Sequence, residues 1–369
     1  MTLRVMLIAG ARPNFMKIAA VHRALVARPG FDVSLVHTGQ HYDAAMSQLF
    51  FEELGIPEPD VNLEVGSASH AVQTAEIMKR FEPVVLERRP HLVVVVGDVN
   101  STAACAMVAK KIPGIGLAHV EAGLRSFDRT MPEEINRLVT DALSDLLFTS
   151  EPSGERNLRA EGIPADRIIP VGNVMIDTLR THLPRAAATG ARERLGLPAR
   201  GYALMTLHRP SNVDDPAVFG PLMDAIADVA ARLPVVFPVH PRTRATLEDW
   251  GATRGGIPAG LVVQDPLGYL DFLALMTEAR LLLTDSGGVQ EETTALGIPC
   301  LTLRENTERP ATVDIGTNLL VGRDPSRLRD AAFEVLAGKA KKGALPEGWD
   351  GRAAERIADA MGGWDRRLR

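Results

Sequence analysis

A run of apolar residues from Leu92 to Val96 constrains the fold more than any other segment, because Gly97 and Asp98 follow it directly. A continuous valine-rich run of this length is typical of a strand buried on both faces, as in a parallel sheet. Similar strand-length apolar runs alternate with helical segments along the whole sequence. This alternation predicts an α/β protein whose parallel sheets are built from βαβ units.

The predicted strands form two sets of similar size, so we expect two domains from 369 residues. The amino-terminal domain is expected over residues 1–172 and the carboxy-terminal domain over residues 173–351, while residues 352–369 form a final helix that packs back on the first domain. The expected strands are Leu3–Ala9, Val33–His37, Leu92–Gly97, Gly116–Val120, Leu146–Thr149 and Ile168–Val171 in the first set, and Tyr202–Leu207, Val235–Val239, Leu261–Gln264, Leu281–Thr284 and Pro299–Leu303 in the second.

Charge and composition exclude several classes of protein. A net charge of −5 argues against a nucleic-acid-binding protein, which usually carries a basic surface. The apolar runs are too short to span a membrane, and the first ten residues lack the pattern of a signal peptide, so we expect a cytoplasmic protein. Two cysteines, Cys105 and Cys300, make neither a disulfide framework nor a metal-ligand set, and buried reduced thiols are predicted.

Three acidic residues follow two of the predicted strands. Asp98 comes directly after the valine-rich strand, Glu121 ends the next strand, and Glu133 lies beyond the loop that follows. Because ligands bind at the carboxyl ends of strands in such sheets, we expect these side chains to converge on one site. Carboxylates that are crowded and partly removed from water can exchange protons near neutral pH. The pattern therefore favours acid–base chemistry on a carbon or oxygen acid.

Two further loops have the composition of phosphate sites. The first, Gly10–Lys17, matches neither the dinucleotide-binding nor the P-loop spacing, but it offers Arg12 and Lys17 at a helix start. In the second, Ser286, Gly287 and Gly288 follow a strand and expose backbone N–H groups at another helix start, as a diphosphate requires. The other residues expected near this second loop are Glu292, which could accept hydrogen bonds from a ribose, and Arg309, which could close over the phosphates.

Two histidines lie at the ends of predicted strands in the second domain. His208, in the motif LHRPSN, is a candidate general acid or phosphate partner if it lies opposite the carboxylates. His240, in PVHP, has the same position at a strand end and a weaker case.

Ten motifs occur in order over nearly the whole chain: GARPNFMK, TGQHYD, GDVNST, HVEAGLRSF, PEEINR, GNVMID, LHRPSN, PVHP, TDSGGVQEE and TERP. Together they resemble the non-hydrolysing UDP-N-acetylglucosamine 2-epimerase family. The resemblance implies two Rossmann-like domains of the glycosyltransferase-B type, with the active site in the interdomain cleft. It also implies an isomerase that interconverts UDP-GlcNAc and UDP-ManNAc by eliminating UDP to a 2-acetamidoglucal and adding it back.

The resemblance also assigns roles to residues and partners. The matching catalytic positions are Asp98, Glu121, Glu133 and His208, and the matching UDP-binding positions are Arg12, Lys17, Phe272, Ser286, Gly287, Gly288, Glu292 and Arg309. The carboxylates would handle the C2 proton while His208 assists the departing diphosphate. Which carboxylate serves which face of the sugar is left open. Neither a nicotinamide cofactor nor a metal is expected, the partners are the UDP-sugar and UDP, and a homodimer in polysaccharide biosynthesis is implied.

Some positions depart from the family pattern and leave the substrate open. Many relatives carry Thr and Glu where this chain has Ala11 and Asn14, and the ARPNF and SFDRTMPEEINR variants resemble the subgroup that acts on UDP-2,3-diacetamido-2,3-dideoxy-glucuronate. Gln40, Arg209 and His240 match a second, activating UDP-GlcNAc site, but Asp43 and Val72 replace polar or basic residues there, so we do not expect activation. Three alternative functions remain: a glycosyltransferase of the same fold, a hydrolysing epimerase and a non-catalytic UDP-sugar sensor.

Overall fold

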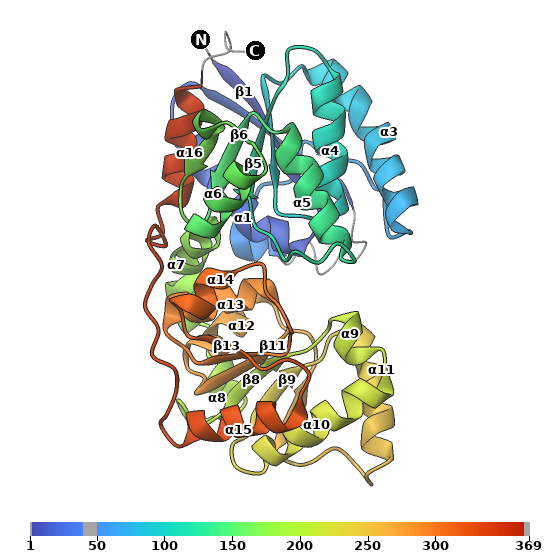
Figure 1. The fold of residues 1–369 in the computed structure, drawn as a ribbon, viewed down its shortest axis with the longest axis vertical. Helices are drawn as coiled ribbons and strands as arrows, with labels where there is room; N and C mark the ends of the chain where they lie inside the picture. The colour runs from blue at the N-terminus through green and yellow to red at the C-terminus, as the bar shows by residue number, and fades with distance from the viewer. Residues whose placement is uncertain (1, 40–49, 365–369) are drawn as a thin grey trace. The chain divides into compact units, whose positions relative to one another are not determined.

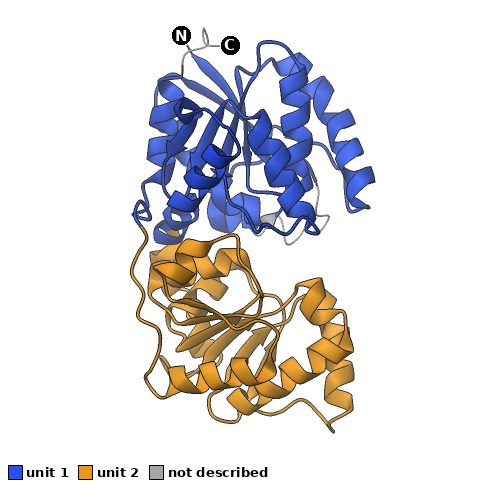
Figure 2. Ribbon diagram, in the orientation of Figure 1, with its two compact units in different colours: residues 1–181, 347–369 blue, residues 182–346 orange. Residues whose placement is uncertain are grey.

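The computed structural model describes residues 2–39 and 50–364, except for the side chain of Arg12. The chain forms two compact units, which comprise residues 1–181 with 347–369 and residues 182–346 (Figure 2). Each unit holds one parallel sheet with interleaved helices (Figure 1), which confirms the predicted fold class. None of the helices in the described ranges is long and apolar enough to cross a membrane.

The sheet of unit 1 has the strand order β3-β2-β1-β4-β5-β6-β7. In this order the chain moves outward in one direction from β1 to β3 and then in the other direction from β4 to β7. The order thus reverses between β1 and β4, the position where doubly wound sheets bind ligands. Its strands are β1 (Leu3–Ala9), β2 (Phe31–His37), β3 (Val61–Asn62), β4 (Leu92–Val96), β5 (Gly116–Ala122), β6 (Leu146–Thr149) and β7 (Ile168–Pro170).

Helices cover the sheet of unit 1 and complete its core. Among the described residues, the helices of this unit are α1 (Arg12–Val26), α3 (His70–Arg88), α4 (Asn100–Lys111), α5 (Pro132–Leu143), α6 (Pro152–Ala160), the first part of α7 (Val174–Ala187) and α16 (Ala353–Gly362), with a 3₁₀ turn at Ala165–Arg167. β4 is buried along its whole length, as its valines predicted, and packs with α3 and α4 in one apolar cluster.

The sheet of unit 2 repeats the same scheme with the order β10-β9-β8-β11-β12-β13, which reverses between β8 and β11. Its strands are β8 (Ala203–Thr206), β9 (Val235–Pro238), β10 (Leu261–Gln264), β11 (Leu281–Thr284), β12 (Cys300–Thr302) and β13 (Asn318–Leu320). Its helices are α8 (Ala191–Arg194), α9 (Pro210–Val213), α10 (Pro216–Ala230), α11 (Pro241–Ala252), α12 (Tyr269–Thr277), α13 (Gly287–Leu296), α14 (Pro310–Asp314) and α15 (Pro325–Leu336).

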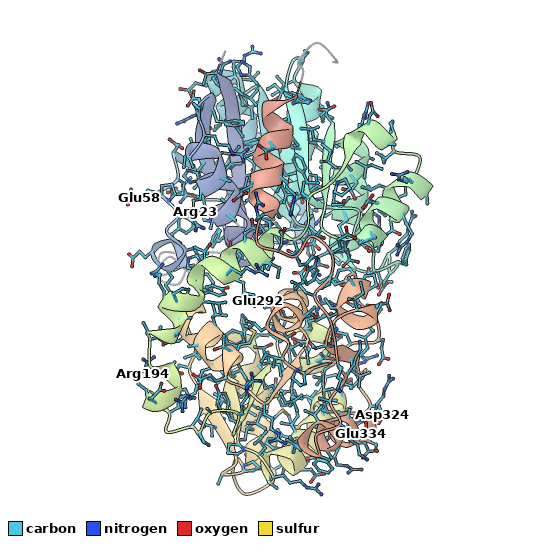
Figure 3. The ribbon with its side chains drawn as sticks, turned by 90° about the vertical axis from the view of Figure 1, so that its left-hand side faces the viewer. Arg23, Glu58, Arg194, Glu292, Asp324 and Glu334 are labelled. Carbon is cyan, nitrogen blue, oxygen red and sulfur yellow. The ribbon has the colours of Figure 1, made fainter. Side chains whose placement is uncertain are left out.

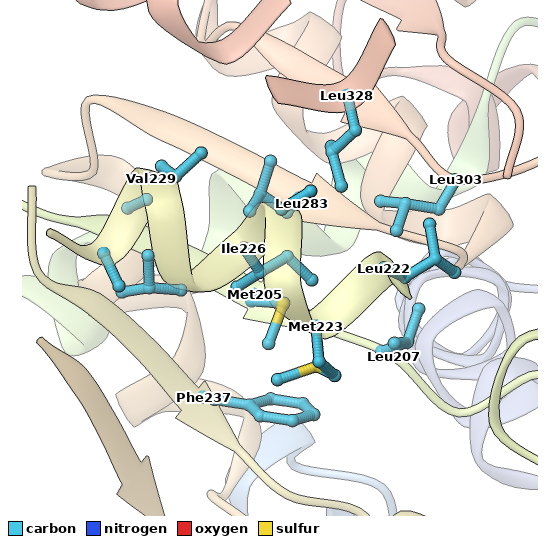
Figure 4. Close-up of a cluster of buried hydrophobic side chains, with 14 of the residues drawn as sticks. Met205, Leu207, Leu222, Met223, Ile226, Val229, Phe237, Leu283, Leu303 and Leu328 are labelled. Atoms are coloured by element: carbon cyan, nitrogen blue, oxygen red, sulfur yellow. The ribbon is translucent and has the colours of Figure 1, made fainter. Parts of the chain in front are cut away.

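The core of unit 2 forms where α10 packs against the sheet (Figure 4). Leu222, Met223, Ile226 and Val229 recur at helical spacing on one face of α10 and are fully buried. They belong to one cluster with apolar side chains of β8, β9 and β11, namely Met205, Phe237 and Leu283. This apolar layer supports the sheet and leaves the loops at the carboxyl ends of its strands available for binding.

The division between the units follows Thr181, within α7, whereas we expected a boundary after Gly172. The first part of α7 belongs to unit 1 because Thr178 donates a hydrogen bond to Met16 O at 2.6 Å. Asp177 accepts hydrogen bonds from Ala353 N and Ala354 N, and so caps the amino terminus of α16. Residues 347–369 belong to unit 1, whereas the second domain was expected to extend to residue 351.

Candidate active site

The ends of β4 and β5 hold two of the three predicted catalytic carboxylates. The two strands are paired in register as far as Val96 and Val120. Asp98 follows β4, and Glu121 lies near the end of β5. Because β4 also pairs with β1, these carboxylates lie beside the point where the strand order reverses. Unit 1 therefore places both groups where a sheet of this kind binds ligands.

Glu121 lies in a bulge with unfavourable backbone geometry. Its φ angle is 74°, and the pairing of β5 with β6 shifts register between Val120 and Ala122. Such a bulge can redirect a side chain next to a functional site, and a positive φ at a residue other than glycine costs about 1–3 kcal/mol. The Glu121 carboxylate is buried and forms an ion pair with Lys17 of α1. Lys17 was predicted to contact phosphate, and its observed contact is this carboxylate.

Gly97 allows the groups around Asp98 to approach closely. Its φ angle is 65°, which favours glycine. A Cβ atom at this position would lie 2.9 Å from Lys17 Nζ and 3.4 Å from Glu121 Oε2. Any larger residue would therefore displace the Lys17–Glu121 pair from the end of β4.

Asn14, one of the departures from the family pattern, has a structural role in this region. Its Nδ2 donates to Val96 O at 2.7 Å, and its Oδ1 accepts from Ala11 N at 3.0 Å. These bonds attach the first turn of α1 to the end of β4. An asparagine amide can donate and accept at the same time, which a glutamate carboxylate cannot do.

Residues of α5 contact both the side chain and the backbone of Asp98. The Asp98 carboxylate forms an ion pair with Arg137, and its carbonyl accepts from Asn136 Nδ2 at 2.9 Å. Glu133 precedes these two residues by three and four positions, so it projects from the same face of α5. The third predicted carboxylate is thus on the helix face that contacts Asp98. Arg137 was not predicted, although its position in PEEINR, four residues after Glu133, offered a signal.

Glu134 fixes both Arg137 and the preceding loop. Its carboxylate pairs with Arg137 at 2.7 Å and accepts hydrogen bonds from Ser126 N and Phe127 N, each at 3.0 Å. Burial alone would raise the pKa of Glu134, but the bonds from Ser126 and Arg137 hold it below its usual range. Glu134 therefore remains an anion that orients Arg137 towards Asp98.

A buried network of polar side chains binds the backbone carbonyl of Gly97. His119 Nε2 donates to Gly97 O at 2.8 Å, and its Nδ1 lies 2.6 Å from Asp141 Oδ1. Asp141 also pairs with Arg125 at 2.7 Å. Burial would raise the pKa of Asp141, but the His119 and Arg125 contacts lower it. This network fixes the backbone immediately before Asp98.

Unit 2 presents a helix start at its own point of strand reversal. α13 begins directly after β11 with Ser286 as its N-cap, and the Ser286 side chain makes no capping hydrogen bond. The first N–H groups of a helix have no partner within the helix and are suited to anions. Ser286, Gly287 and Gly288 are half-buried, so their polar groups remain accessible.

Arg309 packs against this helix start. A Cβ atom on Gly287 would lie 2.5 Å from Arg309 Nη1, so glycine leaves the space that the guanidinium fills. Arg309 is buried and forms ion pairs with Glu308 and, at 3.0 Å, with Glu291. Burial would raise the pKa of Glu308, but Arg309 and Arg304 hold it well below its usual range. The two carboxylates therefore orient Arg309 beside the first turn of α13.

Glu292 lies within α13 (labelled in Figure 3) and is buried. It accepts a hydrogen bond from Tyr269 OH at 3.0 Å. Burial raises the pKa of Glu292 to about 7, and the neighbouring Glu291 adds to the increase. Phe272, predicted to lie near uracil, is half-buried on α12, three residues after Tyr269.

The raised pKa of Glu292 predicts a pH-dependent stability. A carboxyl group whose pKa is raised on folding stabilises the fold below its unfolded pKa, and this contribution is lost as pH rises through the folded pKa. The free energy of unfolding of Glu292→Gln, measured relative to that of the wild type, should therefore increase when the pH is raised from 5 to 8. The expected increase is on the order of 2 kcal/mol. Denaturant unfolding at both pH values measures this. The exposed Glu248→Gln serves as control, and an equal change in both variants would refute the prediction.

His208 follows β8, the strand that lies beside β11 at the point where the strand order of unit 2 reverses. Its Nδ1 is 3.1 Å from Asp285 Oδ1, and the side chain is 42% exposed. The ring of His240, at the N-cap of α11, lies 6.0 Å from the His208 ring between centroids. Arg209 Nε donates to Asp285 O at 2.9 Å. Asp285 was not predicted, although it follows β11 in the motif TDSGGVQEE.

Comparisons with known proteins identify the family of the chain. The family model described as UDP-N-acetylglucosamine 2-epimerase matches residues 23–362. The chain belongs to this epimerase family. It is 41% identical to UDP-2,3-diacetamido-2,3-dideoxy-D-glucuronate 2-epimerase of Pseudomonas aeruginosa, over 97% of this chain and 99% of the relative. It is 40% identical to UDP-N-acetylglucosamine 2-epimerase of Methanocaldococcus jannaschii, over 96% and 98%.

A solved structure supports the same assignment. The crystal structure of Methanocaldococcus jannaschii UDP-GlcNAc 2-epimerase in complex with UDP-GlcNAc and UDP matches with a TM-score of 0.90 and 40% identity, over 98% of this chain and 99% of that chain. The match confirms the predicted glycosyltransferase-B-like, two-domain α/β fold. The protein is therefore an epimerase, a type of isomerase.

Two predicted site residues of this epimerase cannot be placed. Gln40 lies outside the described residues, and the side chain of Arg12 is not described. The other predicted residues fall into two groups. Unit 1 contains Asp98, Glu121, Glu133 and Lys17, while unit 2 contains His208, Arg209, His240, Phe272, Ser286, Gly287, Gly288, Glu292 and Arg309.

Proposed function

We propose that this epimerase inverts C2 of a UDP-N-acetylhexosamine, interconverting UDP-GlcNAc and UDP-ManNAc without releasing the free sugar. The observation that carries the proposal is the pair Asp98 and Glu121 at neighbouring strand ends, each held by its own cation, Arg137 or Lys17. Two carboxylates fixed in this way can take a proton from carbon and return one.

The chemistry proceeds by elimination and addition. A carboxylate of unit 1 takes the C2 proton, the C1–C2 double bond forms, and the C1–O bond breaks with its electron pair going to UDP. The resulting 2-acetamidoglucal is protonated at C2 on the opposite face, and the UDP oxygen adds back to C1. Asp98, Glu121 and Glu133 are the candidate groups for the two proton transfers. No other reactant is consumed, so the reaction balances as an isomerisation.

Unit 2 supplies the groups suited to UDP. The start of α13 and the guanidinium of Arg309 stabilise the negative charge that develops on the diphosphate as it leaves. His208 adds a ring nitrogen that can donate to the same oxygens. Glu292 is the candidate acceptor for the ribose hydroxyls, and Phe272 the candidate contact for uracil. His208 and the start of α13 lie beside the reversal point, Arg309 is the N-cap of α14, and Glu292 and Phe272 lie on α13 and α12.

One relative favours a second substrate. The Pseudomonas aeruginosa protein that is 41% identical over almost its full length is named for UDP-2,3-diacetamido-2,3-dideoxy-D-glucuronate. The C2 chemistry would be the same on that sugar, because its C2 also carries an acetamido group. We therefore keep it as the alternative substrate.

A panel of UDP-sugars tests the proposal. Each sugar is incubated with the enzyme and the products are identified by NMR. Conversion of UDP-GlcNAc to a mixture with UDP-ManNAc supports the main proposal, and conversion of the diacetamido uronate alone supports the alternative. Release of free N-acetylmannosamine with UDP would instead identify a hydrolysing epimerase, and sugar transfer to an acceptor a glycosyltransferase.

Removing the Arg309 guanidinium should weaken UDP binding. A hydrogen bond to a charged group contributes about 1.5–3 kcal/mol, so Arg309→Ala should raise the Kd for UDP about 10- to 100-fold. Isothermal titration calorimetry measures the change. Arg323→Ala, which removes an exposed arginine of unit 2 paired with Glu305 at 3.7 Å, is the control and should leave the Kd unchanged. Equal Kd values for both variants would contradict the role of Arg309.

We extend the proposal to a cytoplasmic homodimer that serves polysaccharide biosynthesis. Cys105 and Cys300 are both buried thiols, which fits a reducing compartment. Light scattering at several protein concentrations tests the dimer.

A further inference from the structure

Asp285 is a buried carboxylate on which several donors converge. It follows β11 and is fully buried. Its Oδ2 accepts from His208 N at 3.0 Å, Arg209 N at 2.8 Å and Asn212 Nδ2 at 3.1 Å. These bonds fix the backbone between β8 and α9. The other oxygen, Oδ1, lies 3.1 Å from His208 Nδ1.

Oδ2 therefore holds mainly the backbone, while Oδ1, which also accepts from His208 N at 3.3 Å, contacts the imidazole. Burial would raise the pKa of Asp285, but the contacts from His208 and Arg209 hold it below its usual value. An ionised carboxylate only accepts hydrogen bonds, so the proton between the two groups belongs to His208 Nδ1. Nε2 is then the nitrogen that remains for a ligand, and the His208 side chain is 42% exposed.

We propose that Asp285 is a positioning residue for His208, which keeps the proton on Nδ1 and presents Nε2 to the departing diphosphate. The inference rests on the proposed function, in which His208 assists that departure. With Nε2 protonated, the ring is a cation whose charge Asp285 balances, and Nε2–H donates to the UDP oxygen as the C1–O bond breaks. The proton stays on the imidazole, so the elimination balances as before.

His240 and Arg209 also lie near His208. His240 lies across from the ring at the N-cap of α11, and its own Nδ1 accepts from Arg242 N at 3.2 Å. Arg209, the next residue along the chain, directs its guanidinium to Asp285 O, and its charge acts on the buried Glu308. Asp285 is thus the carboxylate that contacts the imidazole among the described residues.

A double-mutant cycle tests whether Asp285 acts through His208. Asp285→Asn should lower kcat about 10- to 100-fold with little change in KM, since the lost interaction is made with the departing group. In a His208→Gln background, Asp285→Asn should cost no further activity. Multiplicative losses in the double variant would overturn the inference.

A measurement on the wild type covers the case in which Asp285→Asn does not fold. In ¹⁵N-histidine NMR, the neutral form of His208 should carry its proton on Nδ1, whereas a proton on Nε2 would overturn the inference. The resonance is assigned with His208→Gln, and Asp265→Asn, whose side chain is 90% exposed, is the control variant. This test needs no turnover. A Nδ1 proton in a protein without epimerase activity would therefore refute the proposed function and leave the positioning intact.

Discussion

Asp98→Asn should reduce exchange at C2 by about 10²- to 10⁴-fold, the usual contribution of a group that transfers a proton in the rate-determining step. The amide cannot accept the C2 proton, although it keeps the size of the side chain. Folding should be preserved, because Arg137 retains its 2.7 Å ion pair with Glu134 when Asp98 loses its charge. UDP binding should also be preserved, since the substitution leaves the candidate UDP-binding groups of unit 2 unchanged. Deuterium exchange followed by NMR measures the first effect.

Asp166→Asn is the matched control for this variant. Asp166 is an exposed residue of the same unit, in the 3₁₀ turn before β7. The Asp166→Asn variant should exchange the C2 hydrogen at the wild-type rate and show the same circular dichroism spectrum as the wild type. Wild-type exchange by Asp98→Asn would show that this carboxylate carries no proton chemistry. Loss of UDP binding together with activity would indicate a structural defect instead.

Lys17→Met should destabilise unit 1 strongly. Lys17 and Glu121 are both buried, and removing one partner of a buried ion pair leaves an uncompensated charge that costs about 3–5 kcal/mol. The strained backbone at Glu121, with φ 74°, has to be maintained by its surroundings, and Lys17 is one of them. Hydrogen exchange of unit 1 by mass spectrometry measures the loss without interference from unit 2.

A second substitution separates stability from activity. Adding Glu121→Gln to Lys17→Met removes the unpaired charge and should restore most of the lost free energy, but epimerisation should stay abolished. The control is Lys110→Met, because Lys110 pairs with Asp145 at 2.8 Å with both side chains about one quarter exposed. Its loss should cost about 1 kcal/mol or less. Equal losses from Lys17→Met and Lys110→Met would contradict the buried-pair explanation.

The sequence predicted the sheets well where the pattern was strong. β1 and β11 have the predicted bounds, because a continuous apolar run between turn residues leaves little ambiguity. β3 and β13 were not predicted, since strands of two or three residues at sheet edges leave almost no periodic signal. The division between the units falls within α7 rather than after Gly172, and a helix gives no local sign of which core it contacts.

The sequence indicated where the candidate side chains lie in the fold, but not which residues they contact. Strand ends located Asp98, Glu121 and His208, because the ends of parallel strands share one edge of a sheet. The partners Arg137 and Asp285 were missed, since a single sequence does not show which cation or carboxylate lies across from a given side chain. The bulge at Glu121 was also beyond prediction, because it depends on pairing between β5 and β6.

Proton transfer at C2 is the step on which the proposed epimerisation depends most directly. The decisive measurement is to run the reaction in deuterium oxide with UDP-GlcNAc and to recover both epimers for NMR. Deuterium at C2 of UDP-ManNAc and of the recovered UDP-GlcNAc is the predicted result, because each passage through the glycal replaces that hydrogen with one from solvent. Epimerised product that retains its original C2 hydrogen would contradict the account.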